Sequence, residues 1–462
     1  MTTHHYLVSR ASGVFLMALI FCFRIPLLEG QTSEQKTFTL QQSVRYALQH
    51  NATMLNADLD IQIASKKTKE ITGTGLPQIS LSGDLNYFIE FPTSVIPANA
   101  FIPSAPAGEY LAFQFGLPMT SKAGFDVTQL IFSGEYLVGL QAAKTYAELS
   151  RRSKERTQAD VILQVTKSYY LALMNRERMV LLDANIIRLE KLLKDTRAMN
   201  QQGFVEKIDV DRLSVSLSNL KTERKKMESL TEVSLYLLKF QMGFPVAEAI
   251  TLTDKLSEES ISNDIPTDYN PVNRPEFKLI GLQQKMNELD VKRYRAGYLP
   301  TLAAYGNASY QAFRADFGDI FTQPVTKRWY PQVLVGLQLR VPIFSGMSQN
   351  ARVEQAQLAL LKSRNDADNL KNAIDLEVSN ARVMFNNSLK TLTEQAQNVK
   401  LAEEVSRIAA IKYEEGVGSN LEVVTAEAEL KTAQTDYINT LFEALTAKVE
   451  LQKAAGTLHV EP

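Results

Sequence analysis

The chain has 462 residues, of which 45% are hydrophobic and 22% charged, and its formal net charge is −1. This length allows two or three ordinary domains, and this composition excludes a chain that is disordered throughout. The balanced charge argues against general nucleic-acid binding, which needs a basic surface.

Residues 1–30 have the pattern of a secretory signal peptide. Arg10 gives a positive flank to an apolar run, Gly13 to Phe23, that is too short to span a bilayer. A short anchor that stays attached is the alternative. Cys22 is the only cysteine of the chain and lies in this run. After cleavage the mature chain would therefore have no disulfide and no thiolate metal site.

The rest of the chain consists of two copies of one unit. Four landmarks recur in the same order, each with a counterpart: Leu76 with Leu299, Phe132 with Phe344, Gly203 with Gly416, and Gly243 with Gly456. Duplication on this scale predicts two structural repeats. We assign residues 31–243 to the first and 274–456 to the second. A proline-containing linker, 244–273, joins them, and 457–462 form a C-terminal tail.

Each repeat contains two stretches in which apolar residues alternate with others, as in strands that have two different faces. These stretches predict β-hairpins at about 78–132 (strands 78–91 and 123–132) and about 301–344 (strands 301–313 and 330–344). Prolines between the first two strands predict a long exposed loop. Aromatic residues gather near the strand ends, as in the girdles of membrane barrels. The candidates are Tyr87, Phe88, Phe91, Trp329 and Tyr330. A soluble sheet with an aromatic core is the alternative interpretation.

Long helices follow the strands. Between Gly346 and Gly416 there is no proline, and apolar residues step by three or four from Leu370 to Val399. At about 1.5 Å per residue such a helix would be about 100 Å long. Its first-repeat counterpart runs from about Glu135 to Gln202. Gly203 and Gly416 predict tight turns into a second helix. The expected architecture is a bundle or tube of helical hairpins, because helices this long have no globular core to cover them.

Apart from the N-terminal segment, no apolar run of the sequence is long enough to cross a membrane as a helix. A closed β-barrel is the remaining way to span a bilayer, and it needs at least eight strands. Four strands per chain therefore imply an oligomer, and three chains would supply twelve.

The order of helix, strand pair and long helical hairpin, repeated after a signal peptide, resembles the TolC-type outer-membrane efflux and secretion channels. Local motifs agree at Thr39-Leu40, Arg274-Pro275-Glu276 and Gly297-Tyr298-Leu299-Pro300. The resemblance covers roughly Phe38 to Gly456. It implies a mainly α fold with a membrane β-hairpin pair. Long antiparallel coiled-coil helices would form an α-barrel, and four strands per chain would contribute to a trimeric 12-stranded β-barrel.

The resemblance also implies partners. The homotrimer would sit in outer-membrane lipid, and its periplasmic tunnel would dock on a periplasmic adaptor (membrane fusion protein) and an inner-membrane pump of RND, ABC or MFS type. It would pass drugs, small toxic solutes or secreted protein as a passive, gated conduit, without a cofactor, metal or catalytic residue.

The family carries its gate at the hairpin tips. Asp209 and Tyr413 match the positions of a closed-state hydrogen bond, and Glu422 matches an acidic ring that would attract cations. The adaptor-docking tips correspond to Gly203, Phe204, Val205, Gly416, Val417 and Gly418. Two positions depart from the family pattern: its gating arginine is Gly418 here, and a second acid is Thr425. Helix capping is the alternative role for Asp209 and Glu422.

Two other classes of function fit the sequence less well. An enzyme is disfavoured, because His50 and His459 are the only histidines outside the signal segment and no nucleophile–base pair or phosphate loop is visible. A secreted periplasmic coiled-coil adaptor without a pore would share the long helices. It would not need two strand pairs with aromatic ends.

Overall fold

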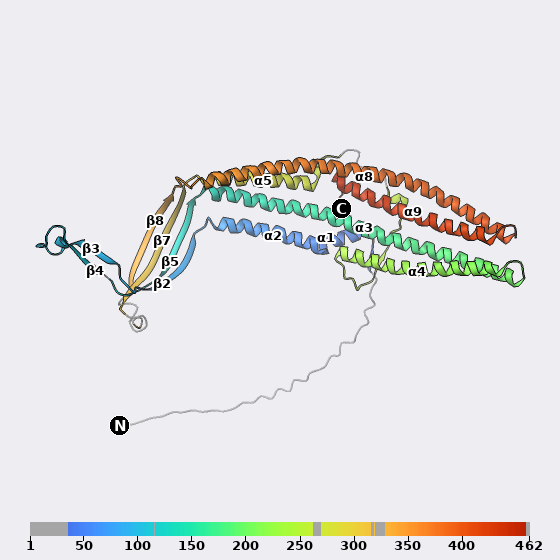
Figure 1. The fold of residues 1–462 in the computed structure, drawn as a ribbon, viewed down its shortest axis with the longest axis horizontal. Coiled ribbons are helices and arrows are strands. Elements are labelled where there is room, and N and C mark those ends of the chain that lie inside the picture. Colours follow the sequence, from blue (N-terminus) through green and yellow to red (C-terminus); the bar gives the residue numbers. More distant parts are fainter. Residues whose placement is uncertain (1–35, 115, 262–268, 316–317, 319–328, 459–462) are drawn as a thin grey trace, which may run out of the picture.

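The computed structural model describes residues 36–458, except 115, 262–268, 316–317 and 319–328. The expected signal peptide, residues 1–30, lies outside the described residues, as do parts of the linker and of the tail. The molecule is a rod of long helices with a β-sheet at one end and two helical tips at the other (Figure 1).

Corresponding helices of the two repeats have nearly equal lengths. In the first repeat they are α2 (Ala52–Gly73, 22 residues), α3 (Gly134–Gln201, 68 residues) and α4 (Lys207–Met242, 36 residues). In the second they are α5 (Pro275–Ala296, 22 residues), α8 (Ser348–Glu414, 67 residues) and α9 (Asn420–Ala455, 36 residues). A further helix, α1 (Leu40–His50), precedes α2. At about 1.5 Å per residue, α3 and α8 are each about 100 Å long, which confirms the expected long helices.

The apolar stripe of α8 explains why this helix folds along its neighbours. Ile374, Val378, Phe385 and Leu392 are all buried, and they recur at steps of three and four residues or their sums. Ile374 and Val378 pack with Ala454 of α9, and Leu392 packs with Leu445. The stripe is thus covered by a neighbouring helix, which is how a helix without a globular core becomes stable.

The same backbone motif ends the helices of both repeats. At the tips, Gly203 and Gly416 have φ of 79° and 75°, the left-handed region that glycine adopts without strain. The next amide donates to the carbonyl five residues earlier, from Phe204 to Met199 and from Val417 to Lys412, each at 3.0 Å. This is the Schellman arrangement, which satisfies carbonyls left free at a helix end.

Four long strands form one antiparallel sheet in the order β2-β5-β7-β8. They are β2 (Gln78–Tyr87), β5 (Met119–Phe132), β7 (Thr301–Arg314) and β8 (Trp329–Arg340). Each repeat gives two strands, as expected, and the hairpins join where β5 pairs with β7. Three expected boundaries were wrong: the first strand ends at Tyr87 and not at 91, the second begins at Met119 and not at 123, and the last ends at Arg340 and does not continue to 344. Pro342, which has no N–H to donate, explains the early end of the last strand.

The proline-rich segment between β2 and β5 also differs from the expected loop. It contains a small hairpin of β3 (Thr93–Pro97) and β4 (Tyr110–Gln114), which projects beyond the sheet (Figure 1). Phe101 packs edge-on against Phe113, with ring centroids 6.0 Å apart. A proline is tolerated at a strand end, and Pro97 is the last residue of β3.

The middle of the rod holds the main apolar core and the ends of several elements. Two short strands, β1 (Lys36–Phe38) and β6 (Ile250–Leu252), pair in parallel there. The core beside them includes Tyr169, Leu173 and Leu238, each at most 1% exposed. The linker between the repeats is therefore anchored against the helices where it is described.

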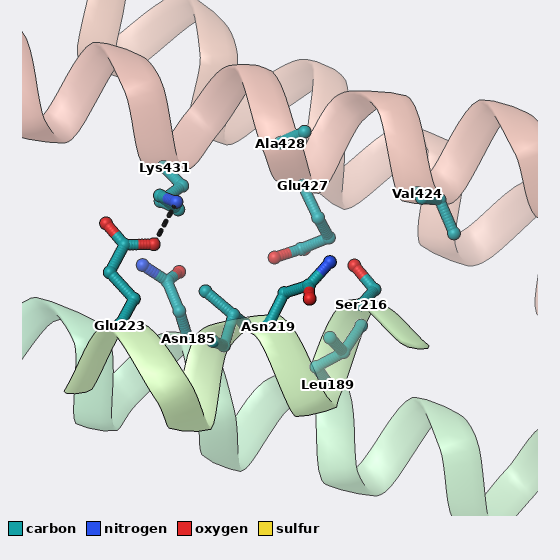
Figure 2. Close-up of a pocket in the computed structure, with 10 residues that line it drawn as sticks. Asn185, Leu189, Ser216, Asn219, Glu223, Val424, Glu427, Ala428 and Lys431 are labelled. Atoms are coloured by element: carbon teal, nitrogen blue, oxygen red, sulfur yellow. Dashed lines mark hydrogen bonds and ion pairs between the residues drawn. The ribbon is translucent and has the colours of Figure 1, made fainter. Parts of the chain in front are cut away.

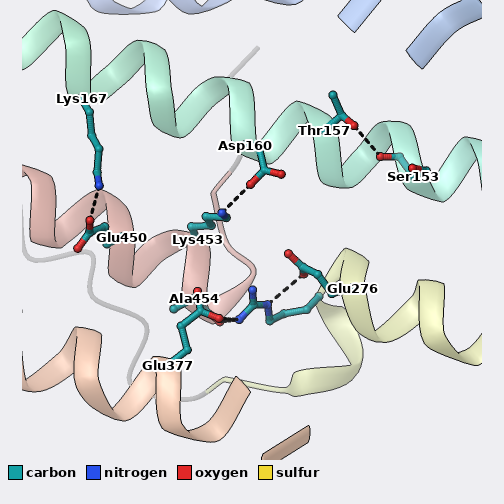
Figure 3. Close-up of polar contacts among 10 residues, drawn as sticks. Ser153, Thr157, Asp160, Lys167, Glu276, Glu377, Glu450, Lys453 and Ala454 are labelled. Atoms are coloured by element: carbon teal, nitrogen blue, oxygen red, sulfur yellow. Dashed lines mark hydrogen bonds and ion pairs between the residues drawn. The ribbon is translucent and has the colours of Figure 1, made fainter. Parts of the chain in front are cut away.

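Buried charge fixes the start of α5 to the two other helices of its repeat. Arg274, which is 4% exposed, donates to Glu276 at 3.1 Å, to Glu377 of α8 at 2.5 Å and to the carbonyl of Ala454 at 3.3 Å (Figure 3). Removing one carboxylate would leave a buried guanidinium partly unpaired, so the cluster holds these helix ends in place.

Two ion pairs between α9 and α3 join the repeats in the same region. Lys453 lies 2.6 Å from Asp160, and Lys167 pairs with Glu450 (Figure 3).

Candidate functional site

One face of the sheet is apolar and open. Residues that lie opposite each other in the register share a face, and Leu81, Phe125, Ala308 and Val333 follow one another across the four strands. Eight large apolar residues of this face are each at least 51% exposed: Ile79, Leu81, Leu85, Phe125, Val333, Val335, Leu337 and Leu339. An open apolar surface of this kind marks contact with lipid or another protein.

The other face of the sheet is mainly polar. Its polar side chains include Ser80, Ser82, Asp84, Asn86, Lys122, Asp126, Thr128, Asn307, Ser309, Gln311, Gln332, Gln338 and Arg340. At its centre Asp126 accepts from Ser82 Oγ at 2.6 Å and from Asn307 Nδ2 at 2.7 Å, which links three strands. Strands that alternate apolar and polar residues in this way are typical of a wall between lipid and water.

The expected interface aromatics lie together at the sheet end remote from the helices. Tyr87 ends β2, and Trp329 and Tyr330 begin β8. Phe88 and Phe91 follow β2, with ring centroids 5.8 Å apart. The structure thus brings these five residues to one end of the sheet, although their contact with a membrane remains a prediction.

Both outer strands of the sheet have a free edge in the described part of the chain. β2 pairs only with β5, and β8 pairs only with β7. Unpaired N–H and C=O groups on an edge strand are a template for another strand. Because β2 and β8 are 10 and 12 residues long, a second copy could continue the sheet at either edge.

At the other end of the rod the two helical tips present apolar side chains. Phe204 is 77% exposed and Val417 is 80% exposed, and each follows the left-handed glycine of its turn. Val205 is partly buried and packs with Tyr413 and Val423 of the other tip. The tips are therefore packed against each other and still expose one large apolar residue each.

Tyr413 and Asp209 do not bond each other in this conformation. Tyr413 is 4% exposed, and its hydroxyl lies 3.2 Å from Thr196 Oγ1 of α3. Asp209, in the first turn of α4, lies 3.8 Å from Arg212 of the same helix. Sequence reasoning missed Thr196, because nothing in the local pattern indicates a partner 217 residues away.

Glu422 lies in the first turn of α9 with an exposed side chain. Its backbone amide is capped by Ser419 Oγ at 3.2 Å. Ser419, and not Glu422, thus supplies the side-chain cap, so the carboxylate of Glu422 is not needed for that task.

Gly418 stands at the family's arginine position. The chain at Lys412 and Tyr413 lies so close to it that there is no space for a side chain. A Cβ there would lie 2.9 Å from Lys412 Cβ and 3.1 Å from the backbone nitrogen of Tyr413. Any larger residue would have to move the turn. This conformation therefore has no room for an arginine-based lock at this position.

A polar seam, missed by the sequence analysis, joins the two helical hairpins near the tips. We define the hairpin seam as Arg188, Glu223, Glu427 and Lys431. Lys431 lies 2.5 Å from Glu223 of α4 (Figure 2). Arg188 of α3 lies 3.4 Å from Glu427. The seam borders a cavity of about 200 Å³ between α3, α4 and α9.

The described residues show no cluster of histidine, cysteine, aspartate or glutamate that could hold a metal ion. Among them, no helix is both long and apolar enough to cross a membrane.

Comparison with known proteins finds one matching family. The model of the family described as "Outer membrane efflux protein" matches residues 272–457, which are nearly the whole second repeat. This part of the chain is therefore similar to that family. The protease secretion protein PrtF of Dickeya chrysanthemi is 24% identical over 315 residues, which are 67% of this chain and 66% of PrtF. Outer membrane protein TolC of Escherichia coli is 22% identical over 450 residues, which are 94% of this chain and 85% of TolC.

Solved structures of outer membrane channels have the same fold. The Campylobacter jejuni CmeC outer membrane channel gives a TM-score of 0.72 at 17% identity, with 92% of this chain and 87% of CmeC covered. The outer-membrane channel OprN gives 0.71 at 16% identity, with 90% and 89% covered. These matches extend the likeness in fold to both repeats.

The match with the first curated relatives is partial. It spans 66% of PrtF and 64% of the probable efflux pump outer membrane protein TtgC of Pseudomonas putida, or about two thirds of each.

Proposed function

We propose that the chain is one subunit of a trimeric, gated conduit through the outer membrane. One observation carries the proposal: the sheet has an open apolar face, a polar face and two free edges. Three sheets joined edge to edge give twelve strands, above the minimum of at least eight that a closed membrane barrel needs. The apolar faces then meet lipid, and the polar faces line a water-filled passage.

The long helices prolong this passage into the periplasm. α3 and α8 begin directly at the sheet and run to the tips (Figure 1). Three copies would place six such helices around one axis, in line with the three sheets. The conduit moves its cargo passively, and the chain's part is to supply a wall and a gate.

The tips are the proposed contact with a periplasmic adaptor. Phe204 and Val417 are exposed there next to the turns at Gly203 and Gly416. A partner helix with an apolar stripe could bury both side chains. Amphipathic helices bind apolar grooves of their partners in the same way. The adaptor would couple the conduit to an inner-membrane pump.

Tyr413, Asp209 and Glu422 are the proposed gate residues. Tyr413 holds the end of α8 to α3 through its hydrogen bond with Thr196. The loss of that bond would release the tip of the α8–α9 hairpin from α3. Three Glu422 carboxylates near the axis would favour cations at the constriction. Asp209 lies one helix away, and its part in the gate would require a contact with a neighbouring subunit or another conformation.

The names of the relatives suggest two kinds of cargo. PrtF is named for protease secretion, whereas TtgC is named as part of an efflux pump. A deletion strain complemented with this chain separates the two. Restored tolerance to several antibiotics would indicate efflux, and restored release of a secreted protein would indicate type I secretion.

The conduit itself is tested with purified protein. We expect a trimer by mass measurement in detergent, and discrete conductance steps in planar lipid bilayers. A monomer that stays in solution without detergent and produces no conductance would contradict the conduit and favour a periplasmic adaptor.

A further inference from the structure

We infer that Asp126 sets the charge selectivity of the sheet part of the conduit, independently of Glu422. The inference rests on the proposed function, because it needs the polar face of the sheet to line the passage. It concerns a residue that lies about halfway along β5, which runs from Met119 to Phe132.

The polar face carries few charges, and Asp126 is its one carboxylate with no cation directly opposite it in the register. Across the four strands this face has only Asp84, Lys122, Asp126 and Arg340. Asp84 and Lys122 lie directly opposite each other in the register, so their charges compensate locally. Arg340 ends β8 at the helical side of the sheet, opposite Thr301.

Neutral groups hold the carboxylate of Asp126 without cancelling its charge. Ser82 Oγ and Asn307 Nδ2 donate to its two oxygens, and Ser309 Oγ donates to Asn307 Oδ1 at 2.8 Å. An ionised carboxylate has about four acceptor positions, of which these bonds use two. The carboxylate is thus held in one orientation, and part of its acceptor capacity is still available to ions in the passage.

The strands approach each other closely beside this network, at Gly124. Gly124 lies two residues before Asp126 on the same face, opposite both Ser82 and Ser309. A Cβ on Gly124 would lie 2.3 Å from Ser309 Cβ. The missing side chain leaves the space in which Ser82 and Ser309 come close to the centre of the network.

Three copies would place three such carboxylates, none with a cation directly opposite it in the register, at one level of the barrel wall. A ring of like negative charges attracts cations and repels anions in a narrow aqueous pore. Asp126 lies in β5 of the sheet, whereas Glu422 lies in the first turn of α9 at the tips. Nearly the whole helical rod separates these two elements (Figure 1). Each ring therefore acts on its own segment of the passage, and the two effects on ion selectivity should be separable.

The test is the reversal potential of the reconstituted channel in a potassium chloride gradient. Asp126→Asn keeps the size of the side chain and its contacts with Ser82 and Asn307, and we expect its potassium-to-chloride permeability ratio to fall at least about twofold. Asp126→Glu should retain the ratio. Ser82→Ala removes one hydrogen bond and no charge, and it should also retain the ratio, which separates a charge effect from a structural one.

The outcomes distinguish this inference from the proposed function. An Asp126→Asn trimer with normal conductance and an unchanged ratio would overturn the inference alone. A wild-type chain that forms no conducting trimer would overturn the proposed function. If Asp126→Asn fails to assemble, the Glu422→Gln channel provides the test. It should keep part of the cation preference, because the Asp126 carboxylates remain. A complete loss of the preference would contradict a role for Asp126.

Discussion

The hydroxyl groups of Tyr413 and Thr196 lie 3.2 Å apart in a buried contact that joins helix α8 to helix α3. The two residues belong to different repeats, so the bond ties one helical hairpin to the other close to the tips. Tyr413 also packs with Val423 and Ala426 of its own hairpin. A change in this bond should therefore alter the packing of both hairpins.

We expect Tyr413→Phe to open the resting conduit. The change leaves the Thr196 hydroxyl without a partner in a buried position, which costs about 1–3 kcal/mol at the contact. Single-channel recordings should show a larger or more frequent open state. Tyr236→Phe is the matched control, because the Tyr236 hydroxyl bonds Glu232 on its own exposed helix face. Conductance and antibiotic sensitivity equal to wild type would contradict a lock at Tyr413.

Asp209→Ala should also favour opening, by a smaller margin. In this conformation Asp209 makes a 3.8 Å ion pair with Arg212, whose side chain is 48% exposed, and such pairs contribute about 0–1 kcal/mol. The same recordings measure the effect. A resting conductance that does not change would remove Asp209 from the proposed gate.

Glu422→Gln should reduce the cation preference of the reconstituted pore. The side chain is exposed and is not the cap of its helix, so its charge is free to act on passing ions. Reversal potentials in asymmetric salt provide the measurement. Glu248→Gln serves as control, because Glu248 lies in the middle of the rod and pairs with Lys36 at 3.3 Å. Equal reversal potentials for Glu422→Gln and wild type would refute the acidic ring.

The hairpin seam should stabilise the packing of the two hairpins by a modest amount. Glu223 and Lys431 lie 2.5 Å apart, with side chains 35% and 31% exposed. A double-mutant cycle with Glu223→Gln and Lys431→Met should give a coupling free energy of about 0.2–1 kcal/mol. Thermal unfolding of the purified trimer gives the four values needed. Purely additive effects would show that the pair contributes nothing to the seam.

Stability should also fall at alkaline pH, in part through Tyr437. Burial and the hydrogen bond to Glu258 Oε1, at 2.8 Å, raise the pKa of Tyr437 from 10.0 to about 12. The folded chain keeps this proton to higher pH than the unfolded chain does. The stabilisation is therefore complete below pH 10 and is lost as the pH rises through 12.

The measurement for Tyr437 is the difference in unfolding free energy between wild type and Tyr437→Phe. It should shrink between pH 10 and 12. Its size will be reduced by solvent screening, because the hydroxyl is near the surface. A difference that stays constant from about pH 8 upward would show that the Tyr437 proton is not linked to folding.

Periodicity predicted the large elements well. The stripe through Ile374, Val378, Phe385 and Leu392 predicts one long helix, and all four residues are buried in α8. Alternation predicted the four strands of the sheet, because each strand has one polar and one apolar face. These patterns arise within a single element, so they can be recognised in the sequence.

Contacts between distant elements could not be predicted in the same way. The network of Asp126 depends on the register of β2, β5 and β7. No local sequence pattern predicts this register. The bond of Tyr413 with Thr196 depends on how two hairpins pack. The small hairpin β3–β4 was missed because its prolines disfavour a strand locally, whereas the packing of Phe101 on Phe113 helps to hold it. Tertiary contacts decided each of these cases.

The free edges of β2 and β8 have a consequence for the biogenesis of the protein. A solitary subunit entering hydrocarbon would bring two rows of unsatisfied backbone groups with it, and each such group costs several kcal/mol there. If the chain forms the proposed trimer, newly made subunits would therefore have to meet one another before or during insertion. The rate of insertion should then rise steeply with the supply of subunits, and a periplasmic chaperone that shields the edges would govern how fast the cell can build the assembly.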